Sequence, residues 1–230
     1  MPTSLGRALQ RRGLHVPGIW PILPGMHRTT LRDLTALTLL WLAALLASGW
    51  SPYERATWLM EVAPVLIALP VLWATHSRLP LTRLALALIG LHGLILMLGG
   101  AYTYARVPLG FTLQDLLGLA RNPYDRIGHF AQGFVPAIVL RELLLRRGGL
   151  APGWLSGVLV LACCLAVSAA YELIEFGAAM ALGQGAEAFL GTQGDPWDTQ
   201  WDMLMCLVGA ICALALLTPW HDRQIARIEA

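Results

Sequence analysis

Three pairs of ionisable side chains lie in or beside apolar stretches of this chain. The pairs are Asp125 with His129, Glu172 with Glu175, and Asp198 with Asp202. The members of each pair are three or four residues apart, the spacing that puts two side chains on one face of a helix. A charge at the centre of a bilayer costs about 3 kcal/mol or more, so such groups normally face a partner or a cavity and mark function. The three pairs therefore predict one shared polar site.

Carboxylates together with one imidazole are the ligand set of a hard or borderline divalent cation, here Mg²⁺, Mn²⁺ or Zn²⁺. A cation would also offset the repulsion between closely packed carboxylates. The predicted metal ligands are His129, Glu172, Glu175, Asp198 and Asp202. A metal-bound water can serve as a nucleophile. The candidate catalytic residues are Glu172, Asp198 and His129, with Glu172 as ligand or general base.

The loop before the last apolar stretch adds further candidates. Its glycines, between residues 183 and 194, suit a segment that folds back over the site. Gln193 is expected to donate hydrogen bonds there, and Asp195 and Asp125 are expected to contribute to the site.

Each candidate also has a structural interpretation. Asp198 and Asp125 could cap the helices that begin near them. His129 alone would more often be an interior histidine with satisfied hydrogen bonds than a metal ligand. Glu172 and Glu175 are harder to explain in this way, because neither a helix end nor solvent accounts for them.

Other polar residues in the apolar stretches are assigned to packing or to the membrane surface. His92 is a further candidate ligand, but its neighbouring glycines favour a packing histidine. Arg141 and Glu142 are expected to form an interfacial ion pair with snorkelling side chains. Tyr104 and Tyr124 are expected in the aromatic belt at the membrane surface.

The elements that position these residues follow from composition. Of the 230 residues, 57% are hydrophobic and 13% charged, whereas soluble domains carry about 25% charged residues. We therefore expect an all-α, polytopic membrane helix bundle, with the lipid bilayer as its surroundings. The net charge of +2, without a basic stripe, argues against a nucleic-acid partner. The oligomeric state is left open.

Six apolar runs are long enough to be membrane spans. They cover about 34–50, 58–73, 84–104, 127–145, 154–182 and 201–217. Residues 107–120 are too short and too polar to span, which predicts an interfacial helix between the third and fourth spans. The expected organisation is a basic arm (1–31), a six-span membrane domain (32–218) and a tail (219–230).

The arginines predict the orientation. They are concentrated in the N-terminal arm, the 74–83 and 146–153 loops and the tail, which share one side if there are six spans. The positive-inside rule then places both termini in the cytoplasm. The predicted polar site lies near the opposite face of the membrane.

Several motifs resemble the bacterial inner-membrane YjdF family. They are Asp125-Arg126-Ile127-Gly128-His129-Phe130, Gln132-Gly133-Phe134, Tyr171-Glu172-Leu173-Ile174-Glu175, and the Gly191 to Met203 segment. The resemblance covers 121–210, and it implies a membrane topology but no reaction. The order Asp-x-x-x-His, Glu, Asp-x-x-Asp is also similar to the VanZ-like membrane proteins, which are linked to glycopeptide resistance. This chain lacks the Asn that those proteins tend to carry after their last Asp.

The preferred hypothesis is a metal-dependent inner-membrane enzyme that acts on a lipid or lipid-linked envelope substrate by hydrolysis or group transfer. A proton-coupled transporter is one alternative, and it would need an acidic path to both faces. A non-catalytic accessory protein is the other, with a polar cluster that only locks helices together.

Overall fold

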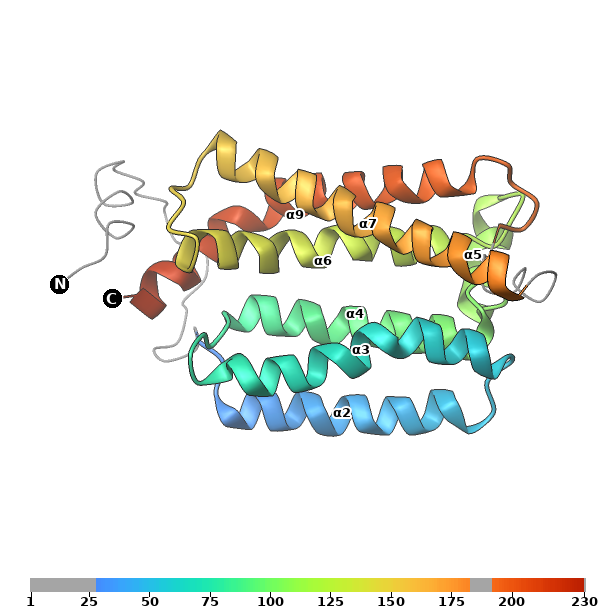
Figure 1. Ribbon diagram of the computed structural model, residues 1–230, viewed down its shortest axis with the longest axis horizontal. Coiled ribbons are helices and arrows are strands. Elements are labelled where there is room, and N and C mark those ends of the chain that lie inside the picture. The colour runs from blue at the N-terminus through green and yellow to red at the C-terminus, as the bar shows by residue number, and fades with distance from the viewer. Residues whose placement is uncertain (1–27, 183–191, 230) are drawn as a thin grey trace.

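The computed structural model describes residues 28–182 and 192–229, which form seven α-helices (Figure 1). These are α2 (Leu31–Trp50), α3 (Arg55–His76), α4 (Arg83–Tyr102), α5 (Pro108–Leu117), α6 (Tyr124–Arg146), α7 (Trp154–Leu182) and α9 (Asp198–Glu229). The expected all-α fold class is confirmed. Most of the predicted N-terminal arm, residues 1–27, lies outside the described residues.

Among the described residues, five helices are long and apolar enough to cross a membrane: α2, α3, α4, α7 and α9. Helix α6 has 23 residues, about 34 Å of helix, and the hydrocarbon core is about 30 Å thick. It is not among the helices that are apolar enough by composition, although it runs alongside the other five (Figure 1). The membrane helix bundle is confirmed, and the sixth span stays a prediction.

The long helices form two layers, with α2, α3 and α4 in one and α6, α7 and α9 in the other (Figure 1). The core of the first layer surrounds Trp41, whose indole N–H donates to the Gly90 carbonyl oxygen at 3.2 Å. The core of the second layer includes Leu84 and Ala85 of α4. Helix α4 therefore contributes to both cores and joins the layers.

Helices α6 and α9 are in backbone contact. A Cβ atom on Gly133 would collide with the carbonyl oxygen of Cys206, and one on Gly209 would collide with the backbone of α6. Small residues allow this close approach between membrane helices. Gly133 follows His129 by four residues, and Cys206 follows Asp202 by four. The contact therefore brings His129 and Asp202 opposite one another, one turn away.

A second polar cluster lies at the other end of α6. Glu142 is fully buried and accepts hydrogen bonds from the Thr82 backbone N–H at 2.9 Å and the Thr82 hydroxyl at 2.7 Å. His221 Nε2 lies 3.1 Å from the same carboxylate, and Arg146 pairs with it. This network ties the start of α4 to α6 and α9.

The expected interfacial ion pair between Arg141 and Glu142 is wrong. Arg141 is buried, and its Nη2 donates to Asp222 at 2.6 Å while Glu142 has other partners. Consecutive residues point about 100° apart around a helix, so their charged groups find different neighbours. Arg141 is 5% exposed, so its side chain does not snorkel to water.

We expect Gly133→Ala to lower the melting temperature of the detergent-solubilised protein. The added methyl group meets the α9 backbone, which cannot rotate away, and overpacking costs about 1–3 kcal/mol. Gly157→Ala is the matched control, because its methyl group would meet nothing within 4 Å. Alanine also favours a helix by about 1 kcal/mol, so this variant should melt at or above the wild-type temperature. Equal melting temperatures for the two variants would contradict the α6–α9 contact.

Candidate functional site

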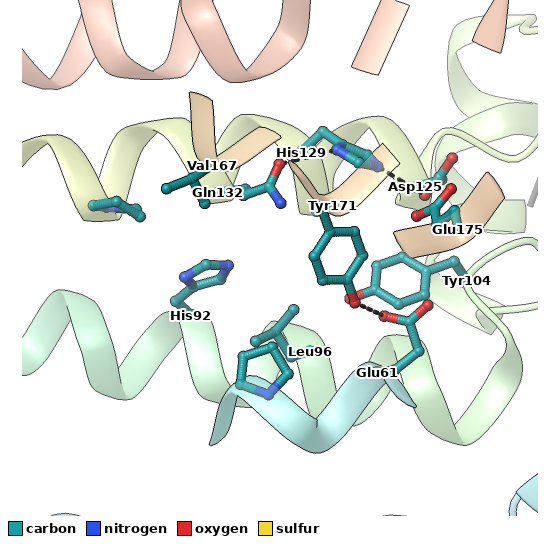
Figure 2. Close-up of a pocket in the computed structure, with 13 residues that line it drawn as sticks. Glu61, His92, Leu96, Tyr104, Asp125, His129, Gln132, Val167, Tyr171 and Glu175 are labelled. Atoms are coloured by element: carbon teal, nitrogen blue, oxygen red, sulfur yellow. Dashed lines mark hydrogen bonds and ion pairs between the residues drawn. The ribbon is translucent and has the colours of Figure 1, made fainter. Parts of the chain in front are cut away.

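His129 lies in the middle of a buried polar cluster (Figure 2). Its Nε2 is 3.7 Å from Asp125 Oδ1 and 3.9 Å from Asp202 Oδ2. Its Nδ1 is 3.9 Å from Glu172 Oε1 and 3.2 Å from Gln132 Oε1. Helices α6, α7 and α9 thus each present a carboxylate to the same imidazole.

Two overlapping groups of donor atoms share His129. One consists of Asp125, His129 and Asp202, and the other of His129, Glu172 and Glu175. Within each group the donor atoms lie within 4.8 Å of one another. Two ligands bound at about 2.1 Å on opposite sides of an ion are about 4 Å apart. Small side-chain movements would therefore bring the donor atoms of either group to distances at which they could bind one ion. The arrangement can accommodate a cation, and metal binding itself stays a prediction.

The cluster is electrostatically incomplete. Among the described residues, Asp125 Oδ2, Glu172 Oε1 and Asp202 Oδ1 are buried oxygen atoms without a hydrogen-bond partner. Their nearest charged or imidazole neighbours, Arg121, His129 and Arg126, are 3.6–3.9 Å away, beyond hydrogen-bond distance. A buried polar atom left unsatisfied costs about 1–3 kcal/mol, and more when it is charged. A ligand with positive charge or hydrogen-bond donors would remove that cost.

Two arginines bind the carboxylates at the end of the bundle where α6 begins. Arg121 Nη1 lies 2.5 Å from Asp198 Oδ1, and Arg126 Nη2 lies 2.8 Å from Asp195 Oδ2. Arg126 Nε is also 3.7 Å from Asp202 Oδ1. Asp198 therefore contacts the arginines and lies outside both donor groups around His129. These arginines were not among the predicted site residues, although Arg121 precedes Asp125 by only four residues.

The predicted loop residues hold the chain in place beside the arginines. Gln193 Nε2 donates to the Asn122 carbonyl oxygen at 3.0 Å, and its Oε1 accepts from the Asn122 N–H at 3.1 Å. The Trp197 N–H, the Arg126 side chain and the charge of Arg121 lower the pKa of Asp195. Residues 183–191 of the glycine-rich loop lie outside the described residues.

The start of α6 differs from one expectation. Asn122 Oδ1 accepts the Tyr124 N–H at 3.0 Å, and α6 has no side-chain cap hydrogen bond at its N-cap residue. Asp125 is therefore a residue of the first helical turn that faces His129, not the N-cap.

The two tyrosines expected at the membrane surface are buried instead. Tyr104 and Tyr124 do not lie in the aromatic belt, and the Tyr124 hydroxyl donates to the Ile95 carbonyl oxygen at 3.1 Å.

A cavity of about 270 Å³ adjoins His129, and its walls come from both helix layers. Glu61 of α3 lines it and accepts the Tyr171 hydroxyl hydrogen bond at 3.1 Å (Figure 2). Tyr104 and Glu175 also line it. The sequence interpretation missed Glu61, which is 4% exposed. Glu61 lies in the expected 58–73 span, and a buried charge in a membrane span is costly. It could therefore have been identified by the same argument that singled out Glu172 and Glu175 in the 154–182 span.

Comparisons with known proteins show the family. Residues 34–223 match the family described as "Predicted membrane protein (DUF2238)". The chain belongs to this family. It is 55% identical over 185 residues to "Inner membrane protein YjdF" of Escherichia coli (strain K12), covering 80% of this chain and 88% of that protein. No solved structure matches the chain significantly. The resemblance to the YjdF family and the multi-pass membrane location are confirmed, while the link to VanZ-like proteins is not shown.

We expect Arg121→Met to lower the melting temperature, because it removes the nearest cation from Asp198, which is 5% exposed. Breaking a buried ion pair costs about 3–5 kcal/mol, and partial exposure of Arg121 reduces this to about 2 kcal/mol. Arg106→Met is the control. Arg106 is exposed and stacks over Tyr53 with its Cζ 4.2 Å from the ring centroid, a contact worth about 0.5–1 kcal/mol.

Adding Asp198→Asn to Arg121→Met should recover part of the lost stability, because the buried carboxylate is no longer charged. If Arg121→Met and Arg106→Met melt alike, the Arg121–Asp198 pair contributes no special stability.

Proposed function

We propose that this protein is a metal-dependent enzyme that hydrolyses, or transfers a group from, a lipid or lipid-linked envelope substrate. The observation that carries the proposal is the convergence of Asp125, Glu172, Glu175 and Asp202 on His129, with all five residues buried. Repulsion between these carboxylates and their unsatisfied oxygen atoms favour a bound divalent cation. Four carboxylates and one imidazole suit Mg²⁺, Mn²⁺ or Zn²⁺.

In the proposed mechanism, His129, Asp125 and Asp202 would hold the cation and Glu172 would be the general base. When bound, the cation would lower the pKa of a water toward neutrality. Glu172 would accept a proton from the attacking water while the water oxygen forms a bond to the carbonyl carbon or phosphorus of the substrate. The bond to the leaving oxygen would break, and Glu172 would pass its proton to that oxygen. Asp198 holds Arg121 rather than the cation.

The two alternatives are less well supported. A proton-coupled transporter would use Glu61 and Tyr171 to extend the acidic path, but it also needs titratable groups open to the opposite face. At that end, the described contacts of Glu142 are with Thr82, His221 and Arg146, a network that is already satisfied. A purely structural lock would be expected to satisfy its polar atoms in the same way, and the cluster around His129 does not.

We also propose that α6 is the sixth span, that α5 lies at the outer interface and that both termini are cytoplasmic. The Thr29 N–H donates to the Leu81 carbonyl oxygen at 2.9 Å, and Arg146 Nε lies 4.0 Å from Glu229 Oε1. The start of α2 and the end of α9 therefore lie at one end of the bundle. The arginine-rich loops are at this end, which the positive-inside rule assigns to the cytoplasm.

Reporter insertions test this orientation. Alkaline phosphatase requires disulfides, which form outside the cytoplasm. We expect the reporter to be active when inserted after Gly118, just beyond α5, and inactive when fused after Ala230. A cytoplasmic fluorescent reporter should give the opposite pattern. Activity of both phosphatase fusions would contradict an even number of spans.

Elemental analysis of the purified protein tests the metal. After equilibration with Mg²⁺, Mn²⁺ or Zn²⁺ and removal of free ions, we expect about one cation per chain for one of these metals. His129→Ala and Asp202→Asn should each lose it, because they remove a proposed nitrogen or oxygen ligand. Asp33→Asn is the distant control, since Asp33 pairs with Arg83 at 3.1 Å, and it should retain the cation.

Asp198→Asn distinguishes a ligand from a residue that positions Arg121. We expect it to retain the cation while the melting temperature falls. Wild-type protein that retains none of the three metals would exclude the metal-dependent mechanism.

A further inference from the structure

An apolar cavity of about 520 Å³ adjoins the polar cavity beside His129. The two cavities share part of their walls, and the shared residues are Pro64, His92, Leu96, Pro136 and Val167. Among the described residues that line the apolar cavity, none is Asp, Glu or Arg. The two adjoining cavities, here called the compartment, thus have a carboxylate-rich end and an apolar remainder.

The compartment runs along the bundle away from the acidic cluster. On α6 the lining of the apolar cavity extends from Val135 to Leu143, which corresponds to about 12 Å of helix. The hydrocarbon core of a bilayer is about 30 Å thick, so one leaflet of it is about 15 Å deep. The apolar cavity therefore extends over most of the depth of one leaflet.

The apolar cavity has an edge between α3 and α7, one helix from each layer. Val71 of α3 is 52% exposed and Val167 of α7 is 46% exposed, and both line the cavity. The two helices do not pack extensively against each other. At the polar end they are joined by the hydrogen bond from Tyr171 to Glu61. An opening at this edge would let a ligand enter sideways from the membrane, on the side of the Tyr171–Glu61 hydrogen bond away from the acidic cluster.

We propose that the compartment binds one phospholipid, with a fatty acyl chain in the apolar cavity and the headgroup phosphate at the His129 cluster. An acyl chain has no polar atoms, so burying it against this wall carries no desolvation penalty. The volume falls within the range of about 300–1,000 Å³ that is typical of ligand sites. A depth of one leaflet fits an acyl chain, whereas a polyprenyl chain is longer. Binding of the phosphate beside the carboxylates rests on the proposed cation.

His92 lies at the junction of the two cavities. Its imidazole points into the space between the layers (Figure 2), and its Nε2 is buried without a hydrogen-bond partner among the described residues. An imidazole nitrogen can donate or accept a hydrogen bond. At this position it would bind the ester group that joins the acyl chain to glycerol, where the ligand changes from apolar to polar.

Photo-crosslinking in nanodiscs tests the proposal. The full chain is reconstituted with phosphatidylethanolamine that carries a diazirine on one acyl chain, and crosslinked residues are mapped by mass spectrometry. We expect crosslinks at Val139 and Leu140 of α6, which line the apolar cavity and form its inner wall. Crosslinks to the lipid-facing surface are expected as well.

Val71→Trp should remove the inner-wall crosslinks by obstructing the edge of the cavity, while lipid-facing crosslinks persist. The matched control is Ile67→Trp, because Ile67 lies on the same helix, is 65% exposed and lines neither cavity. It should keep the inner-wall crosslinks. Crosslinks confined to lipid-facing residues, or equally strong inner-wall crosslinks in both variants, would overturn the proposal.

Elemental analysis of the same samples separates this inference from the proposed function. A bound cation without inner-wall crosslinks would overturn the acyl-chain site and leave the metal site standing. Inner-wall crosslinks without a cation would support the acyl-chain site and overturn the metal-dependent mechanism. A diazirine-labelled polyprenyl phosphate that labels the inner wall in place of the phospholipid would overturn the assignment of a fatty acyl chain.

Discussion

The backbone contact between α6 and α9 is the constraint on which the candidate site depends. Gly133 leaves no room for a side chain against the Cys206 carbonyl group, so the distance between the two helix axes is set there. His129 and Asp202 lie one turn away on the same two helices. Any change that separated α6 from α9 would also separate this imidazole from its carboxylate. The site is therefore positioned by rigid helices rather than by loops.

The two polar clusters on α6 show how differently buried charges can be arranged. Glu142 receives hydrogen bonds from Thr82 and has His221 and Arg146 as further partners. Around His129, carboxylates outnumber nearby cations, and several buried oxygen atoms lack hydrogen bonds. A cluster that only held helices together would gain stability by satisfying those atoms, as the Glu142 network does. The contrast within one helix is the physical argument for a ligand at His129.

Sequence reasoning predicted the helices well because hydrophobic length is a strong local signal. The expected 154–182 span coincides with α7 (Trp154–Leu182), and the other runs begin within one to three residues of the observed helix starts. Helix α9 continues 12 residues beyond the expected end at 217, to Glu229. The sequence also predicted a helix over most of α6, although its charged and polar residues lower its hydropathy. That α6 spans the membrane stays a prediction. Periodicity also predicted correctly that Asp125 and His129 face each other along one helix.

Contacts between helices were harder to predict, because they depend on how each helix is rotated and which helices are neighbours. The order of the chain does not show that Arg121 meets Asp198, or that Glu61 of α3 reaches Tyr171 of α7. Tyr104 was assigned to the membrane surface on residue type alone, yet it is buried against the cavity. A lone charged residue in an apolar run does signal a site, but only the packing of helices identifies its partners.

The separation of polar and apolar surfaces inside the bundle narrows the chemistry of the ligand. A small soluble metabolite would gain little from the uncharged wall between Val135 and Leu143, and a pure hydrocarbon would leave the carboxylates around His129 unsatisfied. An amphipathic molecule satisfies both ends at once, since its polar group removes the cost of the unpaired oxygen atoms and its chain fills the apolar space. In a membrane the abundant molecules of this kind are lipids, and the edge of the cavity between α3 and α7 faces them. The same geometry that makes the carboxylates costly to bury thus favours a substrate drawn from the bilayer itself.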